Sequence, residues 1–253
     1  MAKPLWSAYT SFLPFTITSV TTEATNYPSS RLTQVLPHPI IRRWRSTNTS
    51  QQNIICDLGS SKSVAGVALF GANFRRYTLA HSADNSSYTP VTGTEPDIGQ
   101  DGIDGYYKVF MQTAFTNRYL RVKVNAASNN IIYDSASYFT LGAVVIFSTI
   151  NTWPRDIPVP YDITLQRSYM QSGNDIVPAG PFFIEQEIKT ILARTEISSL
   201  QTIGLLGEHL PILWYRNAGN DTSAVYLLRY KGGMKYTKGL SMWEASPSFQ
   251  ELV

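Results

Sequence analysis

The first 150 residues consist of short runs rich in Val, Ile, Tyr, Phe and Thr, separated by clusters of Pro, Gly, Asn and Ser. Short strands between turn-forming residues are typical of a β-sandwich or barrel, and helical periodicity is scarce. Residues Tyr119–Val124 alternate apolar and polar side chains, so we expect Leu120, Val122 and Val124 to face a core. The strands predicted in this half are Phe15–Thr21, Asn53–Leu58, Val64–Phe70, Tyr77–Ser82, Tyr106–Met111, Tyr119–Asn125 and Phe139–Phe147.

A proline-rich segment, Trp153–Pro160, divides the 253 residues into two parts. Prolines cannot join a β-ladder and favour a stiff connector, so we predict two domains, residues 1–152 and 153–253. The second is also mainly β, with one helix over Thr195–Leu206, where apolar residues recur every three positions. Its predicted strands are Asp162–Met170, Phe182–Thr190, Pro211–Arg216, Val225–Lys231, Leu240–Glu244 and Phe249–Val253.

The composition excludes several classes of protein. A net charge of +3 is too small to indicate nucleic-acid binding, and the lack of any apolar run of membrane-spanning length predicts no membrane insertion. The one cysteine, Cys56, permits no internal disulfide, and its place in an Ile-Ile-Cys strand predicts a small buried hydrophobe. No catalytic-triad motif, P-loop, HEXXH motif or dinucleotide fingerprint occurs, so we predict that the protein is not an enzyme.

A succession of motifs resembles the discoidin family, also called coagulation factor 5/8 type C, over about Asn26–Ser148. The motifs fall in the family's order and approximate spacing: Asn26-Tyr-Pro, Trp44-Arg-Ser, Cys56-Asp-Leu-Gly, His81-Ser-Ala-Asp-Asn-Ser-Ser-Tyr and Arg118-Tyr-Leu-Arg-Val. The resemblance implies an all-β, galactose-binding-like jelly-roll β-sandwich whose loops at one end bind sugars, phospholipid head groups or proteins. It also implies that Trp44 is a buried packing residue with arginines at its rim, whereas Arg42-Arg43-Trp44-Arg45 alone also fits a phosphate-binding patch.

Aromatic rings beside cationic and amide donors suit hydroxyl-rich ligands. The candidate sugar-contacting residues are Asn73, Phe74, Arg75, Arg76, Tyr77, Tyr106 and Tyr107. The alternatives are a solvated turn for the paired arginines and a strand core or domain interface for Tyr106 and Tyr107.

Three carboxylates, Asp97, Asp101 and Asp104, lie in a glycine-rich segment. Carboxylate oxygens are ligands that Ca²⁺ prefers, and some discoidin-like domains hold a structural calcium. The spacing differs from that of an EF-hand, and Asp-Gly pairs also form ordinary turns. Apart from this structural calcium, the sequence predicts no cofactor.

The second half contains three further features with more than one interpretation or with no motif. Glu185 and Glu187 share one strand face, which fits either paired catalytic carboxylates or a solvated face. The segment Lys231–Lys238 predicts a lysine-rich hairpin, either solvated or facing an acidic partner. His209 is predicted to lie in a loop.

The second half, with its expected helix, apolar strands and polar loops, resembles the C-terminal half of minor tail or baseplate proteins of tailed bacteriophages. This resemblance implies a structural protein of the virion at the distal tail, made in the host cytoplasm. Its expected partners are other tail proteins in a ring or hetero-oligomer, and cell-surface glycan. The alternative function is a stand-alone carbohydrate-binding module of a polysaccharide-processing system.

Overall fold

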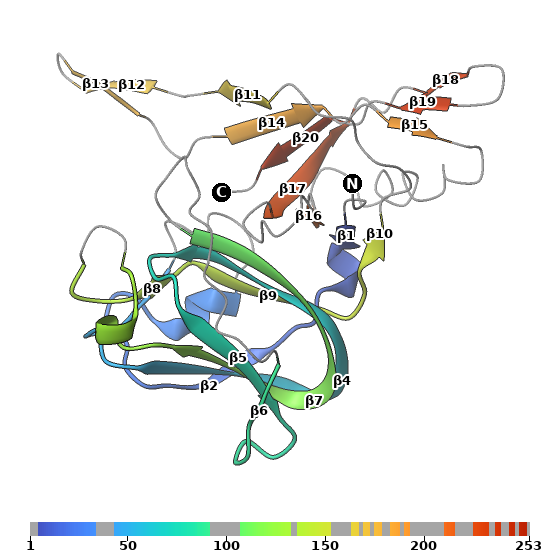
Figure 1. The fold of residues 1–253 in the computed structure, drawn as a ribbon. Coiled ribbons are helices and arrows are strands. Elements are labelled where there is room, and N and C mark those ends of the chain that lie inside the picture. Colours follow the sequence, from blue (N-terminus) through green and yellow to red (C-terminus); the bar gives the residue numbers. More distant parts are fainter. Residues whose placement is uncertain are drawn as a thin grey trace. The chain divides into compact units, whose positions relative to one another are not determined.

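The computed structural model describes residues 5–33, 43–91, 107–132 and 136–152, together with Leu210 and the strands from residue 163 onward that are named below. The described residues are all-β apart from three short 3₁₀ helices: η1 (Tyr9–Ser11), η2 (Ser29–Thr33) and η3 (Ala127–Asn129) (Figure 1). No helix among them is long and apolar enough to span a membrane. The helix expected over Thr195–Leu206 lies outside the described residues.

The chain divides into two compact units. One comprises residues 11–150 with 220–225, and the other comprises residues 1–10, 151–219 and 226–253. The division between Ile150 and Asn151 lies beside the boundary expected from the prolines, and the first ten residues belong with the second half of the chain.

The unit of residues 11–150 is a β-sandwich built on one long antiparallel pair of strands. Strands β4 (Gln52–Ala72) and β7 (Tyr107–Val124) pair from Gln52↔Val124 to Ala72↔Tyr107. Each contains two of the expected strands, so the breaks expected after Leu58 and Met111 are wrong. The physical reason is that the chain bends through irregularities in the pairing and needs no turn to do so.

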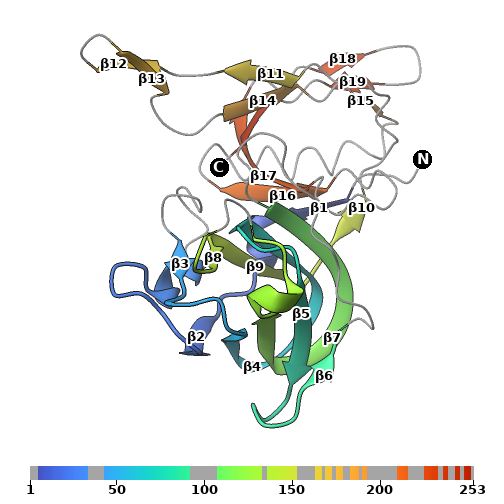
Figure 2. The ribbon, with the colours of Figure 1, turned by 60° about the vertical axis from the view of Figure 1, so that its left-hand side comes forward.

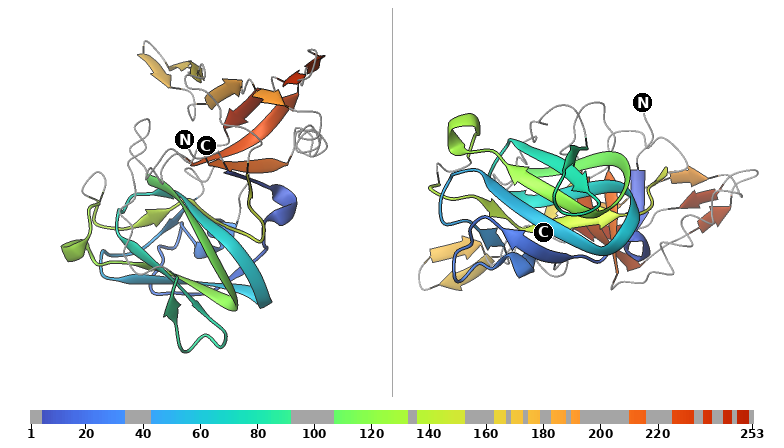
Figure 3. Two further views of the ribbon diagram at one scale, coloured as in Figure 1. Left: turned by 45° about the vertical axis from the view of Figure 1, so that its right-hand side comes forward. Right: turned by 90° about the horizontal axis from the view of Figure 1, so that it is seen from below.

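The other strands join this pair at different points along its length. β2 (Thr16–Val20) pairs with the start of β4, β5 (Tyr77–Ser82) with the end of β7, and β6 (Thr89–Pro90) with β5. β9 (Ala143–Phe147) instead pairs with the later part of β4. The curved β4–β7 pair thus belongs to both layers of the sandwich (Figures 2 and 3). A two-stranded sheet of β3 (Trp44–Arg45) and β8 (Thr140–Leu141) completes the unit.

A bulge in β4 produces the largest irregularity. Asp57 pairs with Tyr119, but the next pair is Lys62 with Asn117, so Leu58–Ser61 face Arg118 alone. Gly59 adopts a φ of 75°, a conformation that side chains with a Cβ rarely take. The Asp57-Leu-Gly motif is therefore a backbone requirement at the bend.

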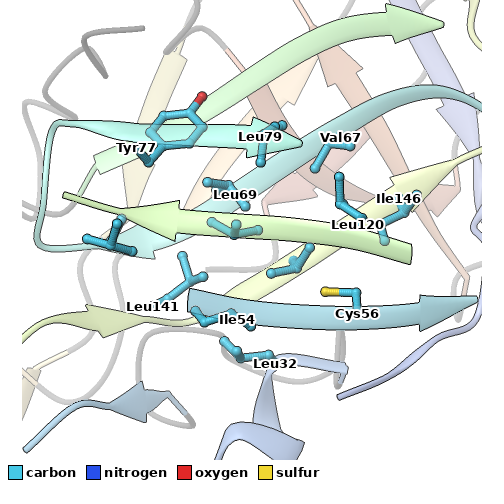
Figure 4. Close-up of a cluster of buried hydrophobic side chains, with 14 of the residues drawn as sticks. Leu32, Ile54, Cys56, Val67, Leu69, Tyr77, Leu79, Leu120, Leu141 and Ile146 are labelled. Atoms are coloured by element: carbon cyan, nitrogen blue, oxygen red, sulfur yellow. The ribbon is translucent and has the colours of Figure 1, made fainter. Parts of the chain in front are cut away.

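The core lies between the two layers and combines residues from strands far apart in sequence (Figure 4). Leu120, Val122 and Val124 are fully buried, which confirms the inward face expected from their alternation. Cys56 is fully buried too, and burial raises the pKa of its thiol, so its predicted role as a small hydrophobe is confirmed. Each fully buried large apolar side chain contributes about 1.5–3 kcal/mol to folding.

The other unit contains a seven-stranded sheet in the order β10 (Asn151–Thr152), β1 (Leu5–Ala8), β16 (Pro211–Tyr215), β17 (Val225–Gly232), β20 (Ser248–Glu251), β14 (Phe183–Glu187) and β11 (Ile163–Gln166). Beside it are the pair β12 (Tyr169–Ser172) and β13 (Asp175–Pro178), and the sheet of β15 (Thr190–Leu192), β19 (Trp243–Ala245) and β18 (Tyr236–Lys238). β17 and β18 belong to different sheets, so the hairpin expected over Lys231–Lys238 is wrong.

Candidate ligand-binding site

The loops of the sandwich gather at one end because the long strand pair folds back on itself. Gln52 and Ala72, the two ends of β4, pair with residues at the two ends of β7, and the bulge lies between them. We call the end away from the bulge the loop end; its described residues are 22–33, 43–51, 73–76, 125–132 and 136–139. The opposite end, around Leu58–Ser61, is called the bulge end.

Two tyrosines and an arginine form the centre of the loop end. The guanidinium carbon of Arg45 lies 3.6 Å from the ring centroid of Tyr138 and 5.6 Å from that of Tyr27. Arg31 lies over the same Tyr27 ring at 5.7 Å. All four side chains are half-buried, so part of each faces solvent. We call these four residues the arginine–tyrosine cluster.

Trp44, next to Arg45 in the sequence, anchors the loops of the cluster to the core. Its side chain is fully buried and its indole N–H donates to the carbonyl of Thr22 at 3.2 Å. The backbone N–H of Arg45 donates to the carbonyl of Tyr27, which ties the two loops together. The burial of Trp44 confirms the packing role implied by the family resemblance, while Arg43 and Arg45 are half-buried beside it. Arg42 lies outside the described residues.

Asn130 organises the neighbouring loop. Its side-chain oxygen accepts hydrogen bonds from the backbone N–H groups of Arg75, Arg76 and Ile131 at 2.8–3.0 Å. Its amide nitrogen donates to the carbonyls of Arg76 and Asn125. Five hydrogen bonds from one side chain therefore fix the turn that carries the paired arginines.

The residues predicted to contact a sugar separate into two groups. Asn73, Phe74 and Tyr77 are buried, with exposed fractions of 2%, 0% and 0%. Arg75 is half-buried and Arg76 is exposed. Three of these five residues are therefore placed in the interior, because strand β5 begins at Tyr77 and turns its ring into the core.

The buried members of this group have structural partners. Asn73 donates to the carbonyl of Tyr138 and accepts from the N–H of Thr140, which joins its loop to the one that carries Tyr138. The hydroxyl of Tyr77 contacts the sulfur of Met111, and burial raises the pKa of Tyr77. Phe74 packs edge to face on Phe139.

Several expectations concern residues that the structure does not describe. Asp97, Asp101 and Asp104 lie outside the described residues, and so do Tyr106 and His209. Tyr107 begins β7 opposite Ala72, with its side chain outside the described part. Among the described residues no group of His, Cys, Asp and Glu is arranged to hold a metal ion.

Glu185 and Glu187 lie on β14, where Glu185 pairs with Thr164 on one side and Gln250 on the other. This is a regular position within a sheet, so the backbone there matches the solvated-face interpretation as well as the catalytic one.

The bulge end has a different chemistry. Arg118 donates two hydrogen bonds of 2.8 Å to the two carboxylate oxygens of Asp57, and the N–H of Gly59 donates to the same carboxylate. The Arg118 hydrogen bond, helped by the one from Gly59, lowers the pKa of Asp57 below its ordinary value, against a smaller opposing effect of desolvation. The ion pair holds the bulge in place.

Sequence reasoning missed Arg31, Asn130 and Tyr138 as members of the loop end. Tyr27 and Arg45 belong to the motifs Asn26-Tyr-Pro and Trp44-Arg-Ser, which indicated the fold and not a binding site. An Asn-Asn pair after a long strand is a signal for a loop that caps its own backbone, and it could have pointed to Asn130.

Comparison with known proteins supports the fold. Residues 16–136 match the family model of the F5/8 type C domain. No curated protein matches the sequence.

Similar solved structures include three bacterial modules. The module CBM32-3 of a family 31 glycoside hydrolase from Clostridium perfringens is 13% identical, with a TM-score of 0.44 over 55% of this chain and 96% of that one. A chitosan-binding module of a chitosanase/glucanase from Paenibacillus sp. IK-5 is 21% identical, with a TM-score of 0.41 over 53% and 96%. A Clostridium perfringens CBM32 module in complex with GalNAc-β-1,3-galactose is 13% identical, with a TM-score of 0.43 over 54% and 99%.

The family match and the long bent strand pair with its Asp-Leu-Gly bulge agree with each other. Residues 16–136 are therefore an F5/8 type C domain, and the discoidin-like β-sandwich is its fold.

Proposed function

We propose that the loop end of this F5/8 type C domain binds carbohydrate and that the protein acts as a glycan-binding module. The observation that carries the proposal is the arginine–tyrosine cluster: half-buried rings, and guanidinium groups with no ion pair to a described carboxylate, on loops that other residues hold in place. Aromatic faces stack on sugar rings and planar polar groups bind hydroxyls, which is the usual chemistry of such sites.

The surface of the loop end favours sugar over lipid. A domain that inserts into a membrane presents several large apolar side chains at its loop tips. Among the described residues of the loop end, Ile131 alone is an exposed large hydrophobic residue, with 47% of its surface accessible. The polar, ring-lined character of the rest suits a hydrated, hydroxyl-rich ligand.

The test is a glycan array probed with the full chain, followed by calorimetry on the strongest ligand. We expect binding that is lost, by at least about tenfold in affinity, in Tyr138→Ala. The matched control is Tyr88→Ala, because Tyr88 is also half-buried and also carries an arginine, Arg121, at 4.2 Å from its ring centroid. An array without binding, or equal losses in both variants, contradicts the proposal.

The role of virion tail protein stays a prediction, and the described residues offer no observation that favours it over the binding module. The two functions differ in assembly state, because a tail protein closes into a ring with its neighbours whereas a binding module works as a monomer. Size-exclusion chromatography with light scattering on the full chain distinguishes them. A defined ring without glycan affinity favours the tail protein.

A further inference from the structure

We propose that the ligand of the loop end is an acidic glycan, whose sugar carboxylate is bound by Arg31 and Arg45, the two arginines that lie against Tyr27. This inference rests on the proposed function and adds the chemical class of the sugar.

The stacking of Arg45 on Tyr138 leaves its guanidinium without a carboxylate partner among the described residues. A guanidinium group presents its flat face to a ring while its five N–H donors point outward in its own plane. The face of Arg45 is taken up by Tyr138 at 3.6 Å, but its Nε is buried and has no hydrogen-bond partner among the described residues. The Nε of Arg121, stacked on Tyr88, is also buried without a partner among the described residues, so this feature is shared by both stacked arginines. Arg45 differs in lying among other arginines at the loop end, where a carboxylate matches the remaining donors of its guanidinium.

Arg31 is placed in the same way. Its guanidinium lies over Tyr27, and its backbone N–H donates to the carbonyl of Pro28, the residue just before the short helix η2. No carboxylate of the described residues forms an ion pair with Arg31 or Arg45, although Asp57 pairs with Arg118 at the bulge end. Both guanidinium groups therefore lie against one ring, at 5.7 and 5.6 Å from its centroid, without an ion pair to a carboxylate of the described residues.

The charged side chains around them are mainly positive. The described residues of the loop end include five arginines and a single acidic residue. That residue, Glu23, accepts a hydrogen bond of 2.8 Å from the N–H of Ser29. Clustered cations at a partly desolvated surface raise the local concentration of anions and strengthen their binding.

The geometry of the donors favours a carboxylate. A guanidinium matches the two oxygens of a planar carboxylate with two parallel hydrogen bonds, as Arg118 and Asp57 show in this same domain. The ligand that combines such a group with the hydroxyls expected of a glycan is a uronic acid.

The experiment measures the affinity of the full chain for uronic-acid oligosaccharides, each beside its own methyl ester. The ester keeps the sugar ring and hydroxyls and removes the charge. We expect the acid to bind at least tenfold more tightly than the ester, and the affinity to fall as salt concentration rises.

Variants assign the effect to the two arginines. Arg31→Gln and Arg45→Gln should each reduce affinity for the acid at least tenfold. Neither should shift the melting temperature by more than about 4 °C, because a single cation–π contact between half-buried side chains is weak. The matched control is Arg121→Gln, an arginine stacked on Tyr88 in another part of the domain, and Lys62→Gln at the bulge end repeats the same loss of charge.

The outcomes separate the two proposals. Equal affinity for acid and ester, or a preference for sulfated over carboxylated sugars, overturns the acidic-glycan inference and leaves carbohydrate binding standing. Binding to phosphatidylserine vesicles without any glycan affinity overturns both. Losses of the same size in the Arg121→Gln or Lys62→Gln controls also count against the inference, because they reduce it to an effect of net charge.

Discussion

The two ends of the sandwich use arginine in opposite ways. At the bulge end Arg118 lies over the ring of Tyr119 at 4.9 Å and gives two hydrogen bonds to Asp57, so the side chain holds the backbone. At the loop end Arg45 lies over Tyr138 at 3.6 Å and makes no ion pair with the described residues. An arginine stacked on a tyrosine can therefore be a structural clamp or an open binding group, and the carboxylate makes the difference.

The loop end can leave Arg31 and Arg45 without a carboxylate partner among the described residues because other residues hold its backbone. Ser46 accepts a hydrogen bond from the N–H of Phe139, Asn73 binds the backbone of Tyr138 and Thr140, and Asn130 fixes the turn of the paired arginines. These neutral side chains hold the backbone there, together with Glu23, which accepts a hydrogen bond from the N–H of Ser29. The comparison predicts that substitutions at the loop end divide sharply into structural and functional ones.

The largest expected effect is that of Trp44→Ala, directly beside Arg45 in the sequence. The indole is fully buried, so its removal should lower the free energy of unfolding of the sandwich by about 3–5 kcal/mol. Urea unfolding, monitored by hydrogen exchange of peptides from residues 11–150, measures the stability of this unit separately from that of the other. Trp44→Phe should lower the free energy of unfolding clearly less. If Trp44→Ala leaves the stability unchanged, the arginine–tyrosine cluster does not depend on the packing of Trp44 in the core.

An intermediate effect is expected for Asn130→Ala. The variant loses five hydrogen bonds, but several of the partners reach solvent, so we expect a loss of about 1–3 kcal/mol by the same measurement. Asn129→Ala is the matched control, since Asn129 is exposed and offers its backbone carbonyl, not its side chain, to Arg76. If the two variants behave alike, the turn of Arg75 and Arg76 is held by something other than Asn130.

The smallest effect is expected for Asp57→Asn at the bulge end. The Arg118 side chain is 42% exposed, so solvent screens the pair and the loss should be about 1 kcal/mol at neutral pH. A double-mutant cycle with Arg118→Gln measures the coupling. Additive losses contradict the role of Arg118 as the clamp.

The same pair predicts a pH dependence. Because the folded protein lowers the pKa of Asp57, the pair contributes stability that is fully present above the ordinary value of 3.8. That contribution is lost as the pH falls through the lowered pKa of the folded state. The difference in stability between the wild type and Asp57→Asn should therefore shrink as the solution is acidified below pH 3.8.

Local patterns were enough to predict the strands and much of the core. The alternation in Tyr119–Val124 predicted its buried face, and strand β5 has the bounds expected for it, Tyr77–Ser82. The motif succession from Trp44 to Arg118 predicted the fold that the family match supports. These features depend on the period of a strand and on local turn chemistry, which a single sequence records.

The ligand-binding prediction went less far because exposure depends on the whole fold. Asn73 and Phe74 precede Arg75 and Arg76 in the sequence and Tyr77 follows them, yet these three are buried, whereas Arg75 is half-buried and Arg76 is exposed. Tyr138 and Arg45 are distant in the sequence, and only the pairing of β3 with β8 brings their loops together. Sequence alone thus determined where strands and a sandwich form, since those depend on neighbours along the chain. Which arginines stay unpaired was decided only by tertiary structure, because that depends on which side chains the folded chain places within reach.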